Sequence, residues 1–372
     1  MGNLLKCLFV FIIVICVTGC AEQRIVEELG FIHSVAYELN EERDSEEAGV
    51  LVMTVALPQI TPTAKEDREV LTTIGHTSKE AKARLSRKTD RILVSGQLRT
   101  ALFSMNLAEK GIHDTMDTLK RDNAIGLNVK IITINGSGKE LLLEDFPKHP
   151  RTSRYIYDLI EKEAKTNTTV DTTLHYFTRD YYDDGIDPIT PIIKMGEGEI
   201  IIDGIALYRH DQMAMTVNPK DSRIFKMLHG DYVGGDLTFE MELEQEEKED
   251  YLFISFTTLE SKRKIKPLSP TKIQIEVEVQ DAIEEYTGYL SLANDDVQRE
   301  IENKLAKKIR TISNTLIEEM QTNRTDALGV GQYVRNNLSY QEWLNLNWRE
   351  VYPTAEIDVQ VNVKLKGFGS VK

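Results

Sequence analysis

The residues of this chain with the clearest capacity for covalent chemistry are its cysteines, because a thiolate is a strong nucleophile. There are three, Cys7, Cys16 and Cys20, all within the first twenty residues. An apolar run, Leu8–Val17, follows the positive charge of Lys6 and precedes Thr18-Gly19. This order is typical of a secretory signal peptide, whose apolar core of about 7–15 residues is too short to span a bilayer. We therefore expect residues 1–19 to be a signal peptide.

The end of this signal indicates a modification of Cys20. The pattern Val17-Thr18-Gly19-Cys20 resembles a bacterial lipobox, in which a hydrophobic residue, a small residue and Gly or Ala precede the cysteine. The resemblance implies cleavage between Gly19 and Cys20, a diacylglyceryl thioether on the Cys20 sulfur, and an N-acyl group such as palmitate on its amino terminus. Stable anchoring to a membrane requires more than one acyl chain, and this modification supplies them. The alternative is an ordinary signal peptide in which Cys20 has no role.

The mature body offers little else for catalysis. With Cys20 acylated, no thiol remains for a disulfide, a thiolate zinc site or a nucleophile. The sequence has no G-x-S-x-G motif, no HExxH motif and no paired-carboxylate motif. The histidines are scattered without a close pair, at His33, His76, His113, His149, His175, His210 and His229. We expect no enzyme activity, no cofactor and no bound metal.

Two short segments could still suggest a ligand. Gly136-Ser137-Gly138-Lys139 follows an apolar stretch, but Thr133 and Glu140 stand where a P-loop needs Gly and Ser or Thr, so we interpret it as a strand-to-helix turn. Four carboxylates surround Gly185 and could ligate a hard cation, at Asp180, Asp183, Asp184 and Asp187. Their spacing does not fit an EF-hand loop, and Asp-Gly and Asp-Pro are common turn sequences. We interpret this cluster as a turn.

The composition indicates an acidic globular body. The 372 residues are 41% hydrophobic and 28% charged, which suits two or three domains with substantial cores. The formal net charge is −15, and loss of the positive Lys6 with the signal leaves −16. So negative a body is poorly suited to bind nucleic acid or an anionic lipid surface. We expect no nucleic-acid partner and a membrane contact made through the lipid anchor.

Periodicity predicts the elements of the first two domains. Residues 20–194 alternate strands with helices, which predicts an N-terminal α/β-like domain with a partly parallel sheet. Its expected strands are Phe31–Leu39, Val50–Leu57, Arg91–Ser95 and Leu127–Ile134. Its expected helices are Arg24–Gly30, Ser78–Leu85, a region that then runs to about Asp122 with a break near Gly111, Glu140–Glu144 and Arg154–Lys165. The pattern of residues 195–262 predicts a small middle α+β domain, with a hairpin within 200–217, a helix at 222–228, and strands at 237–243 and 251–257.

Residues 263–372 predict a third domain. After a basic linker at Ser261–Pro267, apolar and polar residues alternate in Ile273–Val279 and in Ile357–Leu365, which is typical of half-buried strands. Between them, one apolar stripe from Val297 to Met320 predicts a helix of about 30 residues, roughly 45 Å long. We expect an antiparallel sheet packed on this long helix. The fold class is therefore α+β, multi-domain, with mixed sheets and packed helices.

Several short motifs together carry a family resemblance. They are Gly19-Cys20, Glu27-Glu28-Leu29-Gly30, Gly185-Ile186-Asp187-Pro188 with Pro191, Asp203-Gly204-Ile205-Ala206-Leu207-Tyr208, Asp326-Ala327-Leu328-Gly329-Val330-Gly331, Trp343 and Trp348. Nearly end to end, this layout resembles the Ger(x)C lipoproteins, the C subunits of spore germinant receptors. The Cys-Trp-Asp that is common after the family's lipobox is here Cys20-Ala21-Glu22. None of the shared motifs is catalytic.

The resemblance implies a three-domain α+β protein anchored by lipid on the outer face of the spore inner membrane. It implies action with a membrane-embedded A subunit and a transporter-like B subunit in sensing small-molecule germinants. Whether this chain itself contacts the germinant stays open. A solute-binding lipoprotein that delivers a small ligand to a transporter is the alternative, and a lipid-anchored hydrolase is a third reading that the missing motifs disfavour.

Overall fold

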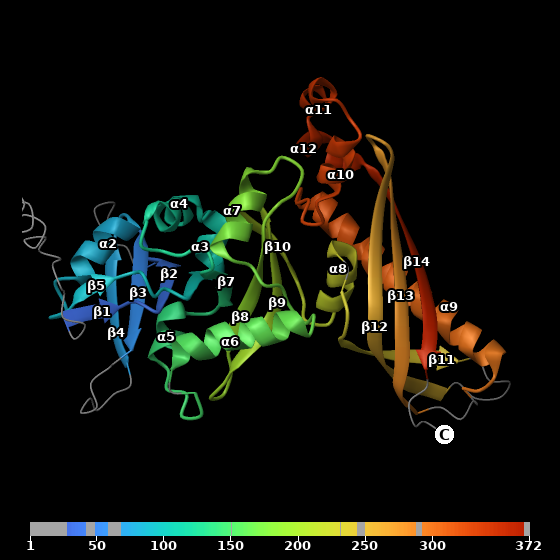
Figure 1. Cartoon of the computed structure of the whole chain (residues 1–372), viewed down its shortest axis with the longest axis horizontal. Coiled ribbons are helices and arrows are strands. Elements are labelled where there is room, and N and C mark those ends of the chain that lie inside the picture. Colours follow the sequence, from blue (N-terminus) through green and yellow to red (C-terminus); the bar gives the residue numbers. More distant parts are fainter. Residues whose placement is uncertain are drawn as a thin grey trace, which may run out of the picture.

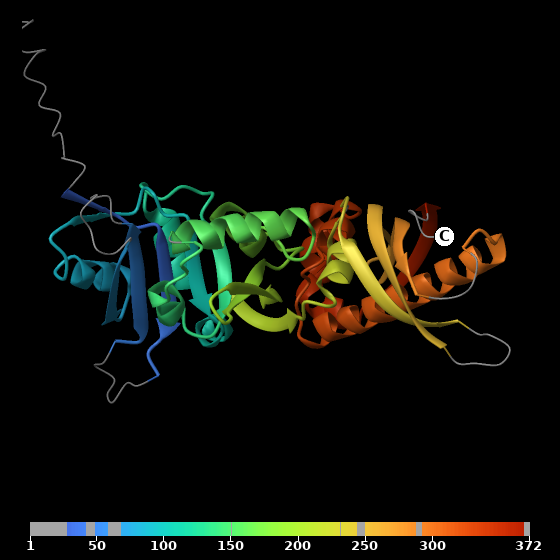
Figure 2. The ribbon, with the colours of Figure 1, turned by 90° about the horizontal axis from the view of Figure 1, so that it is seen from below.

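The computed structural model describes residues 28–41, 49–58, 68–149, 151–230, 232–243, 250–287 and 292–367. Two large sheets with their helices form the two ends of an elongated arrangement (Figures 1 and 2), and the N-terminal sheet lies at the left of Figure 1. A short parallel pair, β1 (Leu29–Phe31) with β5 (Ile92–Val94), extends the N-terminal end. Among the helices described here, none is both long and apolar enough to cross a bilayer.

The N-terminal sheet has eight strands. Their spatial order is β10 (Gln212–Val217), β9 (Ile200–Arg209), β8 (Ile189–Met195), β7 (Lys130–Asn135), β6 (Thr100–Ser104), β2 (Ser34–Leu39), β3 (Leu51–Pro58) and β4 (Arg68–Gly75). The four central strands, β8, β7, β6 and β2, pair in parallel, while the strands outside them pair antiparallel. The predicted partly parallel sheet is confirmed.

Helices cover both faces of this sheet, which explains why its central strands read as continuous apolar runs. One face packs against α2 (Ser78–Leu85), α3 (Met105–Lys110), α4 (His113–Arg121) and α7 (Leu174–Tyr182). The other face packs against α5 (Gly138–Leu143) and α6 (Thr152–Lys165). The break predicted near Gly111 separates α3 from α4, and Gly111 there has a positive φ of 121°.

The C-terminal sheet has four strands in the order β11 (Asp236–Leu243), β12 (Asp250–Ser269), β13 (Lys272–Tyr286) and β14 (Glu356–Gly367). The predicted long helix is α9 (Asp295–Thr322), and its buried stripe packs on one face of this sheet. α8 (Ser222–His229) contacts the same sheet, and α10 (Val330–Asn336), α11 (Tyr340–Leu346), α12 (Trp348–Val351) and a 3₁₀ turn, η2 (Tyr352–Thr354), lie between α9 and β14.

The structure corrects the expectation of a purely antiparallel C-terminal sheet. β11, β12 and β13 pair antiparallel, but β14 lies parallel to β13, with Ile273 opposite Ile357. The reason is the long crossover through α9–α12, which returns the chain to the end of the sheet where β13 began. A parallel pair requires such a crossover of a dozen or more residues.

The expected middle domain at 195–262 is also corrected. β9 and β10 belong to the N-terminal sheet, where β9 pairs with β8 across the expected boundary between residues 194 and 195. α8, β11 and β12 belong with the C-terminal sheet. The basic segment Ser261–Pro267, expected as a linker, lies inside β12. Strand patterns identify strands, but they do not identify the sheet to which each strand belongs.

Other local assignments also differ. Thr100–Ser104, expected within a helical region, forms β6. The sequence pattern did not identify this strand, because a strand buried on both faces shows no alternation of apolar and polar residues. Leu29–Gly30, expected at the end of a helix, belongs to β1, and the rest of that expected helix lies mostly outside the described residues. Several elements have no counterpart among the expected ones: the strands β4 and β8, and the helices α7, α10, α11 and α12. The predicted hairpin of β9 and β10 and the predicted helix α8 are confirmed.

Candidate functional site

Two of the motifs singled out in the sequence meet where the two sheets join. One is the turn between α7 and β8, which contains Gly185-Ile186-Asp187-Pro188, and the other is the turn between α9 and α10, which contains Asp326–Gly331. The backbone N–H of Asp187 donates to the Asp326 carbonyl at 3.0 Å, and the Asp326 N–H donates to the Asp187 carboxylate at 2.9 Å. We call these two turns, with Asp183, Arg335, Trp348 and Arg349, the junction.

Asp326 is the centre of the junction. Its side chain is buried and accepts three hydrogen bonds, from the backbone N–H groups of Val330 at 2.9 Å and Gly331 at 2.7 Å, and from the indole N–H of Trp348 at 2.9 Å. The carboxylate thereby caps the first turn of α10. Burial raises the pKa of Asp326 to about 7, and the negative Asp187 adds to this rise, while the three donors oppose it.

Two arginines complete the junction from the C-terminal half. Arg335 forms a bidentate ion pair with Asp183, at 2.8 and 3.1 Å, and Arg349 donates to Asp187 at 3.2 Å. Burial acts to raise the pKa of Asp183, but hydrogen bonds from Arg335, the Gly185 N–H and Gln332 outweigh it and hold this pKa below its usual range. Bidentate guanidinium–carboxylate pairs fix orientation as well as adding energy, so they set how the halves meet.

Glycines permit the close approach of the two turns. A Cβ on Gly185 would lie 2.6 Å from the Gln332 backbone nitrogen, and a Cβ on Gly331 would lie 2.3 Å from the Trp348 indole nitrogen. Gly329 has a positive φ of 69°, which residues with a Cβ rarely adopt. The turns therefore require glycine for steric and conformational reasons, and the apolar core continues through them from the N-terminal sheet into α8 and α9.

The acidic cluster around Gly185 behaves as a set of paired side chains. Asp180 pairs with Arg179 at 2.7 Å, while Asp183 and Asp187 serve the junction. The Asp183 carboxylate also accepts from the Gly185 N–H at 2.8 Å, a hydrogen bond typical of an Asp turn. No group of three potential metal ligands comes together in the described part of the chain. The interpretation as turn chemistry is confirmed for Asp183, whereas Asp180 lies within α7 and Asp187 accepts from the Asp326 N–H and from Arg349.

The glycine-rich segment 136–139 is a strand-to-helix turn, as expected. It joins β7 to α5, and its donors are already engaged by one carboxylate, Glu38 of β2. That carboxylate accepts from the Ser137 hydroxyl at 3.0 Å and from the N–H groups of Gly138 at 3.1 Å and Lys139 at 2.9 Å. The donors that a phosphate would need are therefore taken by the protein itself.

Two predicted features remain outside this geometry. Gly19 and Cys20, the predicted cleavage and lipidation positions, lie outside the described residues. The predictions also missed Arg335 and Arg349, because an arginine in a helix gives no sign of its partner far away in the sequence. The aspartates and Trp348 were visible as motif residues, but their mutual contacts were not.

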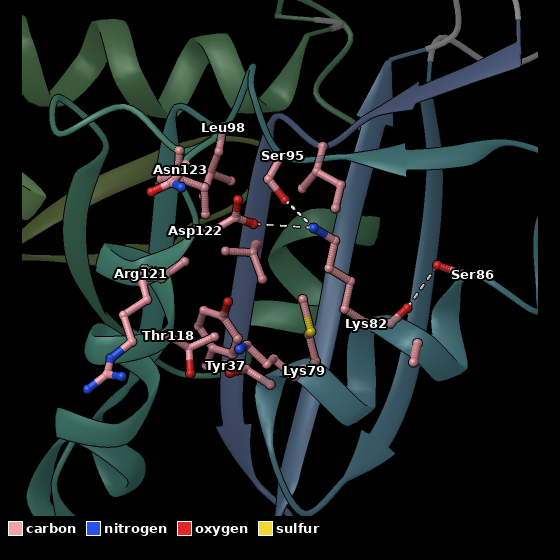
Figure 3. Close-up of a pocket in the computed structure, with 17 residues that line it drawn as sticks. Tyr37, Lys79, Lys82, Ser86, Ser95, Leu98, Thr118, Arg121, Asp122 and Asn123 are labelled. Atoms are coloured by element: carbon pink, nitrogen blue, oxygen red, sulfur yellow. Dashed lines mark hydrogen bonds and ion pairs between the residues drawn. The ribbon is translucent and has the colours of Figure 1, made fainter. Parts of the chain in front are cut away.

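A second candidate site is a cleft on the face of the N-terminal sheet (Figure 3), with a volume of about 610 Å³. Its floor comes from β2 and β3, with Val35, Tyr37 and Met53, and α2 and α4 form its walls. The Lys82 amine on α2 lies 2.7 Å from the Ser95 hydroxyl and 3.5 Å from the Asp122 carboxylate. Burial, reinforced by Asp122, raises the pKa of Tyr37 above its usual range.

This cleft combines an apolar floor with a charged rim, a composition common in small-molecule sites of about 300–1,000 Å³. Lys79 and Arg121 add two cations beside the Lys82–Asp122 pair. No motif pointed to the cleft, because its polar residues come from α2, α4 and two loops whose approach depends on the sheet order.

Comparison with known proteins addresses both ends of the chain. The family described as "Spore germination protein N-terminal domain" matches residues 22–195, and the family described as "Spore germination B3/ GerAC like, C-terminal" matches residues 203–369. The spore germination protein GerQC of Bacillus cereus is 26% identical over 354 residues, which cover 94% of this chain and 95% of that protein. The spore germination protein YndF of Bacillus subtilis (strain 168) is 20% identical over 399 residues, 98% of this chain and 96% of that protein.

A solved structure shows the same fold. The crystal structure of the GerBC protein matches with a TM-score of 0.57 and 14% identity, and the match covers 92% of this chain and 99% of that chain. The two family matches are separated by residues 196–202, which comprise the β8–β9 turn and the start of β9, and together they include the whole junction. On this evidence the chain belongs to the GerAC-like family of spore germination proteins.

Proposed function

We propose that the chain is a lipid-anchored, non-enzymatic subunit of a spore germinant receptor, needed for nutrient-triggered germination. It would act on the outer face of the spore inner membrane through contacts with membrane-embedded A and B subunits. The observation that carries this proposal is the match to both halves of one spore germination family along nearly the whole chain. The motif residues that carry the resemblance help to build a structural junction, where aspartates are engaged by donors of the protein itself, and this supports a role without catalysis.

The proposed anchor is Cys20, with cleavage after Gly19. The lipobox-like pattern Val17–Cys20 supports this, and the acidic composition leaves few other means of holding anionic lipid. Anchoring would concentrate the body beside its partners and so raise their effective concentration.

The test is a Cys20→Ala variant, with Cys16→Ala as the matched control inside the signal. We expect Cys20→Ala to abolish lipid attachment and to impair germination with one class of nutrient, while Cys16→Ala behaves as the native chain. The experiment requires a strain without redundant receptors. Full germination of the Cys20→Ala strain on every nutrient would reject the proposal.

The alternative, a solute-binding lipoprotein that feeds a transporter, is favoured by one observation, the 610 Å³ cleft between α2 and α4. It predicts micromolar binding of a small ligand, lost in a Lys82→Met variant and retained in Lys220→Met, a lysine on the loop before α8. Calorimetry with amino acids, sugars and nucleosides measures this. Flat titrations would reject the alternative and leave the receptor proposal standing. Adjacent genes for a multi-spanning protein and a permease-like protein would favour the receptor.

A further inference from the structure

A small pocket at one edge of the N-terminal sheet gathers positive charge in a chain whose net charge is −15. Its volume is about 60 Å³, and its polar lining residues are His33, Arg68, Arg99, Arg151, Thr152 and Arg154, with Ser153 beside them. None of its lining residues, all in the described part of the chain, is acidic. We call it the arginine pocket.

The pocket lies at the N-terminus of α6, a helix of 14 residues. Its N-cap residue, Arg151, makes no capping hydrogen bond through its side chain, and the first turn has no acidic residue. Among the described residues, nothing accepts from the N–H groups of Thr152 and Ser153. These free donors and the helix dipole make this end of α6 electropositive.

The Thr152 side chain gives an independent indication of a ligand. It is 1% exposed, and its hydroxyl has no hydrogen-bond partner in the part of the chain that the structure describes. Buried hydroxyls are nearly always hydrogen-bonded, and an unpaired one lowers stability. An acceptor bound in the pocket would satisfy this hydroxyl together with the helix N–H groups.

The arginines differ in how they are held. Arg68 donates to the carbonyls of Leu142 and Leu143 at 3.1 Å, so it forms a fixed wall. Arg154 pairs with Asp158 at 3.1 Å across one helical turn. For Arg99 and Arg151, no described residue supplies a side-chain hydrogen bond or ion pair.

Arg99 and Arg151 line the same pocket as His33. Burial lowers the pKa of His33, and the charges of Arg99 and Arg151 lower it further. These two guanidinium groups therefore act on the same small space without a countercharge from the described protein.

We propose that the arginine pocket binds a phosphate-type oxyanion, carried either by a lipid headgroup or by a small phosphate compound in solution. Guanidinium groups bind phosphate oxygens in pairs, and helix N-termini add aligned N–H donors. The pocket has room for one such group, and Thr152 supplies a hydroxyl donor. This proposal is independent of the receptor role, because it concerns one edge of the N-terminal sheet and not the junction or the cleft.

The test measures the reaction of Arg151 with phenylglyoxal in the full-length chain, in a phosphate-free nonionic detergent, by mass spectrometry. Inorganic phosphate should slow this reaction saturably, at least about fivefold, because a bound oxyanion shields the guanidinium. Arg87, an exposed arginine outside the pocket, is the internal reference and should be unaffected.

Variants distinguish binding from a merely structural effect. Thr152→Val should weaken phosphate protection by about threefold or more while leaving the thermal midpoint without phosphate unchanged or higher, because it removes an unpaired hydroxyl. Arg99→Gln should weaken protection by about tenfold, since it removes a charge-assisted contact. The double variant Lys110→Gln/Lys220→Gln removes two exposed charges elsewhere and should bind phosphate like the native chain.

Vesicles distinguish the two sources of phosphate. If phosphatidylglycerol vesicles protect Arg151 without added phosphate, and vesicles of a phosphate-free glycolipid do not, the site takes a lipid headgroup. If only added phosphate protects, the site takes a soluble phosphate. Unsaturable protection, equal protection of Arg87, or unchanged protection in both Thr152→Val and Arg99→Gln would overturn the proposal.

Discussion

Two aspartates in the C-terminal half, Asp326 and Asp281, are buried to nearly the same extent but occupy opposite surroundings. Asp326, in the junction, is 4% exposed and accepts hydrogen bonds from two backbone N–H groups and the Trp348 indole. Asp281, in β13, is fully buried, and neither of its carboxylate oxygens makes a hydrogen bond of normal geometry to a described residue.

Their neighbours explain the difference. Asp281 lies opposite Thr258 of β12, and the hydroxyls of Thr258, Ser261 and Tyr232 are likewise buried without partners in the described part of the chain. Burial raises the pKa of Asp281 to about 6, and only the Thr258 hydroxyl lies close enough to oppose this rise. Burial alone therefore does not determine the role of a carboxylate: Asp326 accepts from three donors and joins two turns, whereas Asp281 has no comparable set of donors.

The largest expected effect is that of Asp326→Ala. It leaves three buried donors without an acceptor, and each unsatisfied group costs about 1–3 kcal/mol, so we expect a loss of at least about 3 kcal/mol in the free energy of unfolding. Urea denaturation of the full-length chain in nonionic detergent measures it. The matched variant Asp281→Ala should lose much less. Equal losses in the two variants would remove the distinction between the two sites.

Gly185→Ala tests the junction through packing and not through charge. The new Cβ would meet the backbone of Gln332 at 2.6 Å, which cannot move without displacing α10. Overpacking of this kind costs about 1–3 kcal/mol, so we expect a loss of about 2 kcal/mol. Gly126→Ala is the control, because nothing lies within 4 Å of its added Cβ. If the Gly185→Ala chain were as stable as the Gly126→Ala chain, the two turns could move apart with little loss of folding free energy.

The sequence predicts some features of this fold and junction but not others. The long helix and the strands around it were predictable, because apolar residues recur every three to four residues in α9 and every two residues in β13 and β14. Asp187 and Asp326 were visible as motif residues, whereas the signal peptide stays a prediction because residues 1–19 lie outside the described residues. The parallel pairing of β14 and the arginine partners depend on contacts between segments more than 80 residues apart. The sheet to which each strand of residues 195–262 belongs depends on its pairing with strands on either side of that range. No local pattern encodes these contacts.

Replacement of Asp281 should act in the opposite direction from that of Asp326. Asp281→Val substitutes a strand-favouring apolar side chain for a carboxylate without good partners. At pH 7.5 we expect a gain of about 1–2 kcal/mol in the free energy of unfolding, because removing an unsatisfied buried group is neutral or stabilising. Asp281→Asn keeps the shape and should give a smaller gain. A clear loss in Asp281→Val would mean that the carboxylate is satisfied in the folded chain.

The last prediction concerns the pH dependence of that gain. Since the pKa of Asp281 is raised from 3.8 to about 6, the folded chain keeps a proton there that the unfolded chain has lost. The bound proton contributes fully to the free energy of unfolding below about pH 4, and this contribution is lost as the pH rises through about 6. The advantage of Asp281→Val over the native chain should therefore shrink by about 2 kcal/mol between pH 7.5 and pH 4.5, which is close to the whole gain. Urea denaturation at the two pH values measures this change. An Asp326→Asn variant measured in the same way tests whether the junction carboxylate, with its pKa near 7, titrates over a higher pH interval. A constant advantage across this range would show that Asp281 is already ionised at pH 4.5, and its surroundings would then have to supply donors as those of Asp326 do.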